Sequence, residues 1–509
     1  MSYFELLKLT APEAIVVLTA LVVLAIGLTS GRGTVEAAVP AAESKENAGD
    51  TPAATATASA IGSLAATVGL AIAIGAVLML PQNATLFGGM LVITPLTSLF
   101  KIICLALALF TVFLARNDRS SRNPGEYLAM LLLATIGLML LVGSEELLMI
   151  FIGLELTGLS LYVMAAFDKT DVRSAEAGLK YFLFGSTASA FTLFGISIIY
   201  GMSGTTSLAA IGQKLSSGPI QALLAVGIVM TLIGFAFKIA AAPFHLWAPD
   251  AYQGAPVPSA AFIASGSKVA SFVVLGKIVL VGFAPAHGSA DWHAMVAGWS
   301  PVLAALAALS ILVGNLVALA QTNVRRLLAY SAVAHTGYTL LGLVAGGRAG
   351  FSATLFYTTI YAVTLVGAFG VVALVRRETG GDDFQNFAGL SSRSPLLAGC
   401  MAIFILSLAG IPPLAGFFGK FYVFSVTLGA GGNHGLLWLV ALALFGSLIS
   451  LYYYLIVLKV IFVDQAATQT SVVKVDLLSR MSLTVLALLV LLLGITPEAL
   501  AARIIASLP

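Results

Sequence analysis

One hydrophobic segment ends in a run of polar and helix-breaking residues. Lys238 is followed within twelve positions by Pro243, His245, Pro249 and Asp250. A charged side chain at the centre of a membrane helix costs roughly 3 kcal/mol or more to insert. A broken helix at that depth is tolerated only against protein or a water-filled cavity. This combination of residues suggests a path for ions or protons.

The composition of the chain indicates the solvent around it. Of the 509 residues, 59% are hydrophobic and only 9% are charged, and the mean hydropathy is +1.03. Soluble domains carry about 25% charged residues, so we predict an all-α polytopic membrane protein without a soluble domain. The net charge of +3 gives no reason to expect nucleic acid as a partner. Cys104 and Cys400 lie in separate apolar runs and are interpreted as packing residues, because two cysteines alone cannot hold an iron–sulfur cluster.

Hydropathy predicts about fourteen transmembrane helices, since a helix needs about 20 apolar residues to cross a bilayer. The seventh is expected to break at Pro243 and to continue toward Tyr252, and the twelfth to break at Gly410-Ile-Pro412-Pro413. The expected ranges are 12–29, 59–80, 92–115, 127–143, 146–167, 176–202, 219–241, 256–284, 299–320, 326–346, 350–375, 396–429, 434–463 and 481–504.

The distribution of basic residues predicts the orientation of the chain. Alternate loops carry fourteen of the 25 Lys and Arg residues, and the opposite loops and termini carry four. The positive-inside rule therefore places both termini on the non-cytoplasmic side. One cytoplasmic loop, residues 31–58, is rich in Ala, Thr, Glu and Gly and is expected to be flexible, as a tolerated insertion or as a contact for a partner.

The remaining seven basic residues are all lysines within predicted spans, and they fall into two groups. Three lie near span ends, where a lysine can extend to the headgroups: Lys101, Lys277 and Lys459. Four lie deeper or beside a helix break and are candidate proton carriers: Lys180, Lys238, Lys268 and Lys420. Lysine suits this chemistry because burial can bring a lysine pKa toward neutrality, whereas arginine stays charged.

Glu155 is the only acid near the middle of a predicted span. A buried carboxylate that faces lysines on neighbouring helices has its ionisation tied to theirs, and a structural ion pair is the alternative. His245 and His335 are candidate proton relays, because histidine titrates near pH 7, or else they only form hydrogen bonds. The sequence contains no pattern for a metal or cofactor site.

Six stretches around these residues carry a family resemblance. They are Leu148-Met-Ile-Phe-Ile-Gly-Leu-Glu155-Leu, Ala177-Gly-Leu-Lys180-Tyr-Phe, Pro243-Phe-His-Leu-Trp-Ala-Pro-Asp-Ala-Tyr-Gln-Gly-Ala-Pro256, Ser265-Gly-Ser-Lys268, Arg325-Arg-Leu-Leu-Ala-Tyr-Ser-Ala-Val-Ala-His335-Thr-Gly-Tyr and Leu408-Ala-Gly-Ile-Pro-Pro-Leu-Ala-Gly-Phe-Phe-Gly-Lys420-Phe. With them, nearly the whole chain from about residue 90 onward resembles the antiporter-like membrane subunits of respiratory complex I, the bacterial NADH-quinone oxidoreductase. Tyr252 stands where the sister subunits of this family usually have a second histidine.

The resemblance implies a proton-translocating subunit of the bacterial inner membrane with no redox centre of its own. Partner membrane and peripheral subunits would carry NADH, FMN, iron–sulfur clusters and quinone. The fold would contain two inverted five-helix repeats, here residues 116–284 and 285–463, with three helices in 1–115 and one in 464–509.

The resemblance also implies roles for single residues. Glu155 would be the acid of a Glu–Lys pair, with Lys180 and Lys238 as basic partners on the next two helices. Lys268 would be the central lysine and Lys420 the lysine of the second half-channel. His335 would belong to the hydrated path between the halves. Two alternatives stay open: a stand-alone cation/proton antiporter, and a structural subunit whose polar residues only hold helices together.

Overall fold

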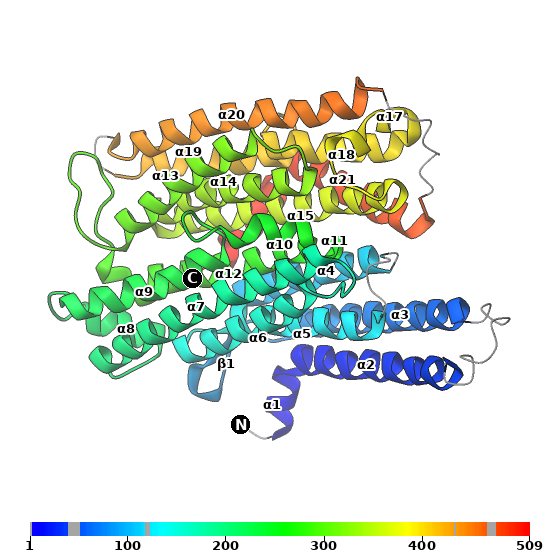
Figure 1. Cartoon of the computed structure of the whole chain (residues 1–509). Helices are drawn as coiled ribbons and strands as arrows, with labels where there is room; N and C mark the ends of the chain where they lie inside the picture. The colour runs from blue at the N-terminus through cyan, green and yellow to red at the C-terminus, as the bar shows by residue number, and fades with distance from the viewer. Residues whose placement is uncertain are drawn as a thin grey trace.

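The chain folds almost entirely into helices that run side by side (Figure 1). A computed structural model describes residues 3–38, 51–116, 118, 123–431, 434–465 and 475–508. Within these residues, twelve helices are long and apolar enough to cross a membrane. Two shorter apolar helices, Ala222–Lys238 and Pro395–Ala409, are the first parts of the two broken spans. Together they account for the fourteen predicted spans and confirm a polytopic all-α membrane protein.

The first half of the chain begins with three helices and a small hairpin. Its elements are α1 (Tyr3–Leu9), α2 (Ala11–Ala38), α3 (Thr51–Leu78), β1 (Ala84–Leu86), β2 (Leu91–Ile93), α4 (Pro95–Ala115), α5 (Pro124–Gly143), α6 (Leu147–Ala165), α7 (Val172–Ser203), α8 (Leu208–Leu215), α9 (Ala222–Lys238), α10 (Trp247–Gly254), α11 (Val257–Ala264) and α12 (Gly266–Lys277), which a π-helical turn, Ile278–Gly282, extends. The strands β1 and β2 pair antiparallel, with Thr85 opposite Val92.

The second half contains the longest helix and a second broken span. Its elements are α13 (Trp299–Ala318), α14 (Val324–Ala345), α15 (Gly347–Thr379), α16 (Phe384–Phe387), α17 (Leu390–Arg393), α18 (Pro395–Ala409), α19 (Ala415–Gly429), α20 (Leu437–Phe462), α21 (Leu477–Ile495) and α22 (Glu498–Ser507).

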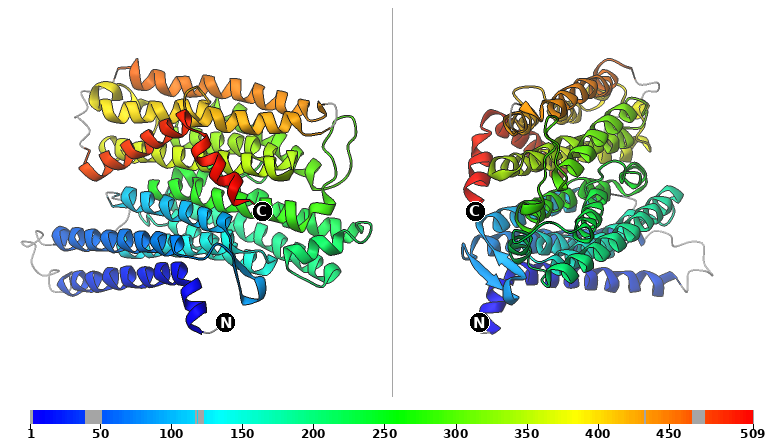
Figure 2. Two further views of the ribbon diagram at one scale, coloured as in Figure 1. Left: turned by 180° about the vertical axis from the view of Figure 1, so that it is seen from behind. Right: turned by 90° about the vertical axis from the view of Figure 1, so that its left-hand side faces the viewer.

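The centre of the bundle is formed by α14 and α15. The most apolar 18-residue stretch of α14 is 94% buried, and so is that of α15, whereas that of α2 is 22% buried. In Figure 1, α2 and α3 lie at one edge of the bundle and α20 at the other, and Figure 2 shows α21 and α22 on the opposite side from the viewer of Figure 1. The span of α11 and α12, Val257–Gly282, is equally buried, so residues on these central helices can contact both halves of the chain.

Three predicted element boundaries differ from the structure. Residues 31–38 continue α2 and residues 51–58 begin α3, so both ends of the expected loop 31–58 are helical. The alanines of 51–58 favour a helix. Residues 39–50 lie outside the described part of the chain. The last predicted span is two helices, because Pro497 cannot continue α21. The eighth is interrupted at Ser265, whose φ and ψ are −114° and −80°.

Candidate functional site

The first helix break lies directly after Lys238. Thr336 Oγ1 donates to the Ile239 carbonyl at 2.6 Å, Trp247 Nε1 donates to the Phe237 carbonyl at 3.1 Å, and the Ala242 amide donates to Ser310 Oγ at 2.8 Å. Side chains from other helices thus satisfy the backbone groups that the break sets free. The break is therefore packed against protein, one of the two surroundings in which a broken membrane helix is tolerated.

Lys238 itself is 6% exposed, and its Nζ has no hydrogen-bond partner among the described residues. The ammonium lies 5.5 Å from the centre of the Tyr162 ring and 5.9 Å from that of Phe237, within range of cation–π attraction. A Cβ on Gly158 would lie 2.8 Å from Nζ. Lys238 therefore lies against α6, within one turn of Glu155.

Glu155 is half-buried and accepts a short hydrogen bond from Ser189 of α7. Lys180, on the same helix α7, does not pair with Glu155: it contacts Asp250 at 2.7 Å and Glu176 at 2.6 Å. Among the described residues, neither Lys180 nor Lys238 forms an ion pair with Glu155, so this structure does not show the Glu–Lys pair that the resemblance implies. Ser189 lies nine residues beyond Lys180, about 13 to 14 Å along a helix, so the two residues meet different neighbours.

The surroundings of Lys180 are polar and partly open. Its side chain is 38% exposed, and both of its acidic partners line a pocket of about 280 Å³ together with Arg173 and Arg326. Arg326 also contacts Asp250, at 2.7 Å. Asp250 thus joins two basic groups from different helices. Lys180 is not a fully buried lysine like Lys238.

Lys268 occupies the centre of the bundle. It is 2% exposed, and its Nζ donates to the Ala332 carbonyl at 2.7 Å and to Thr336 Oγ1 at 2.9 Å. The same Thr336 hydroxyl contacts Ile239, the residue after Lys238. The central lysine is therefore linked to the first helix break through one side chain of α14.

Lys420 lies beside the second helix break. Gly410 ends α18 with a φ of +85°, a conformation that suits glycine. Lys420 Nζ donates to the Ala409 carbonyl at 2.9 Å and to Ser447 Oγ at 2.8 Å, and the lysine is 5% exposed. The break thus supplies the carbonyl that holds the ammonium.

His335 lies between these two lysines. The Tyr361 ring is 5.4 Å from Lys268 Nζ and 4.9 Å from the His335 ring. The Tyr338 ring is 5.3 Å from Lys420 Nζ and 5.6 Å from the His335 ring. Lys268, His335 and Lys420 therefore lie along α14, and Lys238 lies beside the first helix break, where the Ile239 carbonyl contacts the same helix.

His245, the possible second relay, lies on the connection after Pro243 and is 6% exposed. Its Nδ1 has no hydrogen-bond partner among the described residues, and its ring meets that of Tyr330 edge-on at 6.3 Å. His245 therefore lies beside α14, which also carries His335 and Thr336.

The three lysines assigned to span ends differ from one another. Lys459 has a side chain that is 66% exposed, 3.6 Å from Asp464, which fits the expected position near the headgroups. Lys101 is instead buried in an ion pair of 2.6 Å with Glu13. Lys277 is 5% exposed and donates to the Val142 carbonyl at 3.0 Å. For Lys101 and Lys277 the expectation of headgroup contact is wrong, because groups at the ends of neighbouring helices, Glu13 of α2 and the Val142 carbonyl of α5, bind their ammonium groups.

One buried charge network was not identified from the sequence. Asp382, 3% exposed, contacts Arg325 at 3.2 Å and Arg376 at 2.9 Å. Burial alone would raise the pKa of Asp382, but the two guanidinium groups lower it below its ordinary value overall. Arg325 begins one of the stretches that carry the family resemblance, but no pattern in the sequence indicated that it lies in a buried ion pair, and it is 1% exposed. An acidic residue so soon after the Arg376-Arg377 pair was the feature of the sequence that could have indicated this network.

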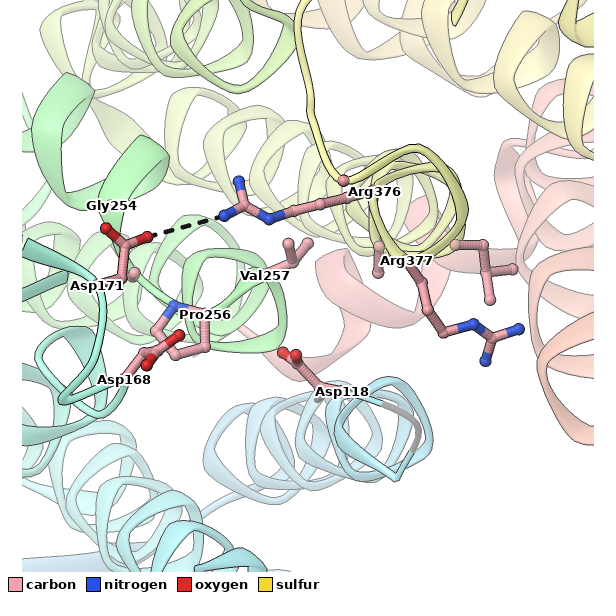
Figure 3. Close-up of a pocket in the computed structure, with 12 residues that line it drawn as sticks. Asp118, Asp168, Asp171, Gly254, Pro256, Val257, Arg376 and Arg377 are labelled. Carbon is pink, nitrogen blue, oxygen red and sulfur yellow. Dashed lines mark ion pairs between the residues drawn. The ribbon is translucent and has the colours of Figure 1, made fainter. Parts of the chain in front are cut away.

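A second polar pocket lies at the same end of the bundle as this network. It has a volume of about 300 Å³ and is lined by Asp118, Asp168, Asp171, Arg376 and Arg377 among others (Figure 3). Figure 3 shows Arg376 extending toward Asp171, and the two groups are 3.9 Å apart. None of the sequence-predicted site residues lines it. Among the described residues there is also no cluster of three or more His, Cys, Asp or Glu side chains that could hold a metal ion.

Residues 144–450 match the model of the family described as "NADH:quinone oxidoreductase/Mrp antiporter, TM". The chain belongs to this family. It is 45% identical over 510 aligned residues to NADH-quinone oxidoreductase subunit N 2 of Acidobacterium capsulatum, covering 98% of each chain. It is 38% identical to NADH-quinone oxidoreductase subunit N of Desulforamulus reducens, covering 86% of this chain and 89% of the relative. The predicted resemblance to complex I subunits is confirmed, and among them to subunit N, as Tyr252 indicates.

Solved structures share the fold of this chain. A chain of respiratory complex I from Thermus thermophilus is 32% identical, with a TM-score of 0.73, covering 88% of this chain and 97% of that one. A chain of the Mrp complex from Dietzia sp. has a TM-score of 0.75 at 19% identity, covering 98% and 97%. The second likeness shows the fold alone.

Proposed function

We propose that this chain is the proton-translocating subunit N of a bacterial NADH-quinone oxidoreductase. The observation that carries the proposal is the 45% identity to a subunit N over 98% of both chains. The likeness to an Mrp chain, at 19% identity, gives no better support to a stand-alone cation/proton antiporter. The redox cofactors, NADH, FMN, iron–sulfur clusters and quinone, belong to partner subunits in this proposal.

The proposed proton path runs along Glu155, Lys238, Lys268, His335 and Lys420. Lys180 lies near one end, in contact with Asp250, and His245 lies beside the first break. The two broken spans, α9–α10 and α18–α19, are the discontinuous helices of two inverted repeats, residues 116–284 and 285–463. The chain lies in the inner membrane with both termini on the non-cytoplasmic side.

The interaction between two buried charged groups is large enough to supply the energy that proton transport needs. Moving one charge against the membrane potential costs about 2.3 kcal/mol per 100 mV. Two unit charges 4 Å apart interact by about 4 kcal/mol at an effective dielectric constant near 20. A movement of Glu155 toward or away from Lys238, driven by quinone reduction elsewhere in the complex, can therefore drive the lysine to release a proton toward Lys268 and on to Lys420.

Two measurements test the proposal together. The tagged chain should co-purify with flavin and iron–sulfur subunits that reduce quinone. Lys238→Ala should then leave the complex assembled but strongly reduce coupled quinone reduction and proton uptake. Lys214→Ala, which removes a lysine near the end of α8 outside the path, is the control and should have little effect. Normal proton uptake by Lys238→Ala, or purification as a sodium exchanger alone, would contradict the proposal.

A further inference from the structure

His335 is held from both sides of its ring by tyrosine hydroxyls. The Tyr357 hydroxyl lies 2.7 Å from Nδ1, and the Tyr454 hydroxyl lies 3.1 Å from Nε2. The Tyr454 hydroxyl is also 2.5 Å from Ser331 Oγ. The four side chains come from α14, α15 and α20, and none is more than 3% exposed. Ser331, Tyr454, His335 and Tyr357 therefore form one continuous hydrogen-bonded chain, which we name the hydroxyl–imidazole chain.

From this geometry we infer that Tyr454 and Tyr357 are relay residues that carry a proton through His335. The inference rests on the proposed function and adds residues to it. A neutral imidazole has one donor and one acceptor nitrogen, and a hydroxyl can both donate and accept. Each member of the chain can therefore take a proton on one side while it gives another away on the other side.

The transfer balances without an ionised tyrosine at its end. When an excess proton arrives at Ser331 Oγ, the serine passes a proton to the Tyr454 oxygen and the Tyr454 O–H proton moves to His335 Nε2. The N–H proton of Nδ1 then moves to the Tyr357 oxygen, which releases its own O–H proton toward the neutral Lys420 amine, the acceptor in this proposal. Every O–H or N–H bond that breaks is replaced by a new one. His335 ends as the other neutral tautomer, and one positive charge has crossed the chain.

The ring of Tyr357, the last residue of the hydroxyl–imidazole chain, packs against the second broken helix. The Tyr357 ring packs so closely on α19 that a Cβ on Gly419 would collide with it, and Gly419 directly precedes Lys420. The titratable groups that surround His335 are Lys268 and Lys420, each separated from it by one tyrosine ring, Tyr361 or Tyr338. The hydroxyl–imidazole chain is thus placed to pass protons between the centre of the bundle and Lys420.

Phenylalanine substitutions in the purified complex test the inference, because they remove a hydroxyl and keep the ring. The measurement is proton uptake per quinone reduced, in vesicles. Tyr454→Phe and Tyr357→Phe should each lower this ratio by at least half of the decrease that His335→Ala causes. In the His335→Ala background, Tyr454→Phe should add nothing further, because the relay is already broken.

The chain offers a matched control in Tyr127. Its hydroxyl lies 2.8 Å from Ser259 Oγ, so it makes the same kind of buried tyrosine–serine contact as Tyr454, away from the path. Tyr127→Phe should leave the ratio unchanged, and both variants should lose a similar small amount of thermal stability. If Tyr454→Phe and Tyr127→Phe gave the same ratio, the Tyr454 hydroxyl would be structural and the inference overturned.

Two further outcomes keep the test decisive. If Tyr454→Phe did not assemble, Ser331→Ala and Tyr357→Phe would replace it, and a wild-type ratio in either would overturn the relay. If the tyrosine variants kept the wild-type ratio while Lys238→Ala lowered it, the relay would be wrong and the proposed function would stand. A wild-type ratio in Lys238→Ala would contradict the proposed function itself.

Discussion

Lys101 and Glu13 form an ion pair of 2.6 Å between α4 and α2, with side chains only 6% and 12% exposed. A Cβ on Gly143 would lie 3.5 Å from the Lys101 ammonium, so this pair adjoins the end of α5. The pair joins the peripheral helix α2 to the bundle. Removing one of the two charges leaves the other buried without a partner, which costs stability. Replacing both residues by apolar ones leaves no buried charge and costs much less.

Lys101→Met should therefore destabilise the purified protein by about 3 to 5 kcal/mol, the usual cost of breaking a buried ion pair. The double variant Lys101→Met/Glu13→Leu should recover most of that loss, since no unpaired charge remains. Thermal unfolding of the single and double variants measures the difference. A double variant less stable than Lys101→Met would contradict this account.

Lys420 and Lys459 offer a comparison of buried and exposed lysines. Lys420 is 5% exposed and bound to a carbonyl at a helix break, whereas the Lys459 side chain is 66% exposed. Lys420→Met should lower proton uptake in vesicles by more than half, and Lys459→Met should change it little. Equal effects at the two sites would show that burial beside a helix break does not identify a proton carrier here.

The charge of Glu155, rather than its shape, should matter for activity. Glu155→Gln keeps the volume and can still accept the hydrogen bond from Ser189, so assembly should survive while coupled quinone reduction falls strongly. Glu155→Asp should retain much of the activity because the carboxylate remains. Ser189→Ala is the control for the hydrogen bond. If the Gln and Asp variants behaved alike, Glu155 would be only a hydrogen-bonding group.

The Asp382 network predicts a defined pH dependence of stability. Because the pKa of Asp382 is lowered below its ordinary value of 3.8 in the folded protein, its contribution is present above about pH 4 and is lost as the pH falls through the lowered pKa. Asp382→Asn should therefore destabilise the protein by a constant amount between about pH 5 and 8. Asp464→Asn, in an exposed pair with Lys459, should have almost no effect. A loss that grew steadily across pH 5 to 8 would point to another titrating group.

The spans, their breaks and the burial of Lys238, Lys268 and Lys420 could be predicted from the sequence, because each depends on local properties. The burial of Lys101 and Lys277 could not. About 20 apolar residues suffice to indicate a span, and proline after Lys238 or at Pro412 is enough to end a helix whatever surrounds it. The depth of Lys268 and Lys420 within apolar runs likewise follows from their neighbours along the chain. The family could be recognised for the same reason, since its motifs are contiguous.

The tertiary structure decided which of these groups meet. Glu155 contacts Ser189 rather than Lys180, Lys101 contacts Glu13 rather than the headgroups, and His335 lies between Tyr357 and Tyr454. These partners depend on the rotation and the axial shift of one helix against another. Packing of whole helix faces sets both quantities, and residues on uniformly apolar helices leave no amphipathic pattern from which to predict them. The sequence by itself determined that the chain crosses the membrane with buried charges, and only the packing of α14 against its neighbours decided how those charges are connected.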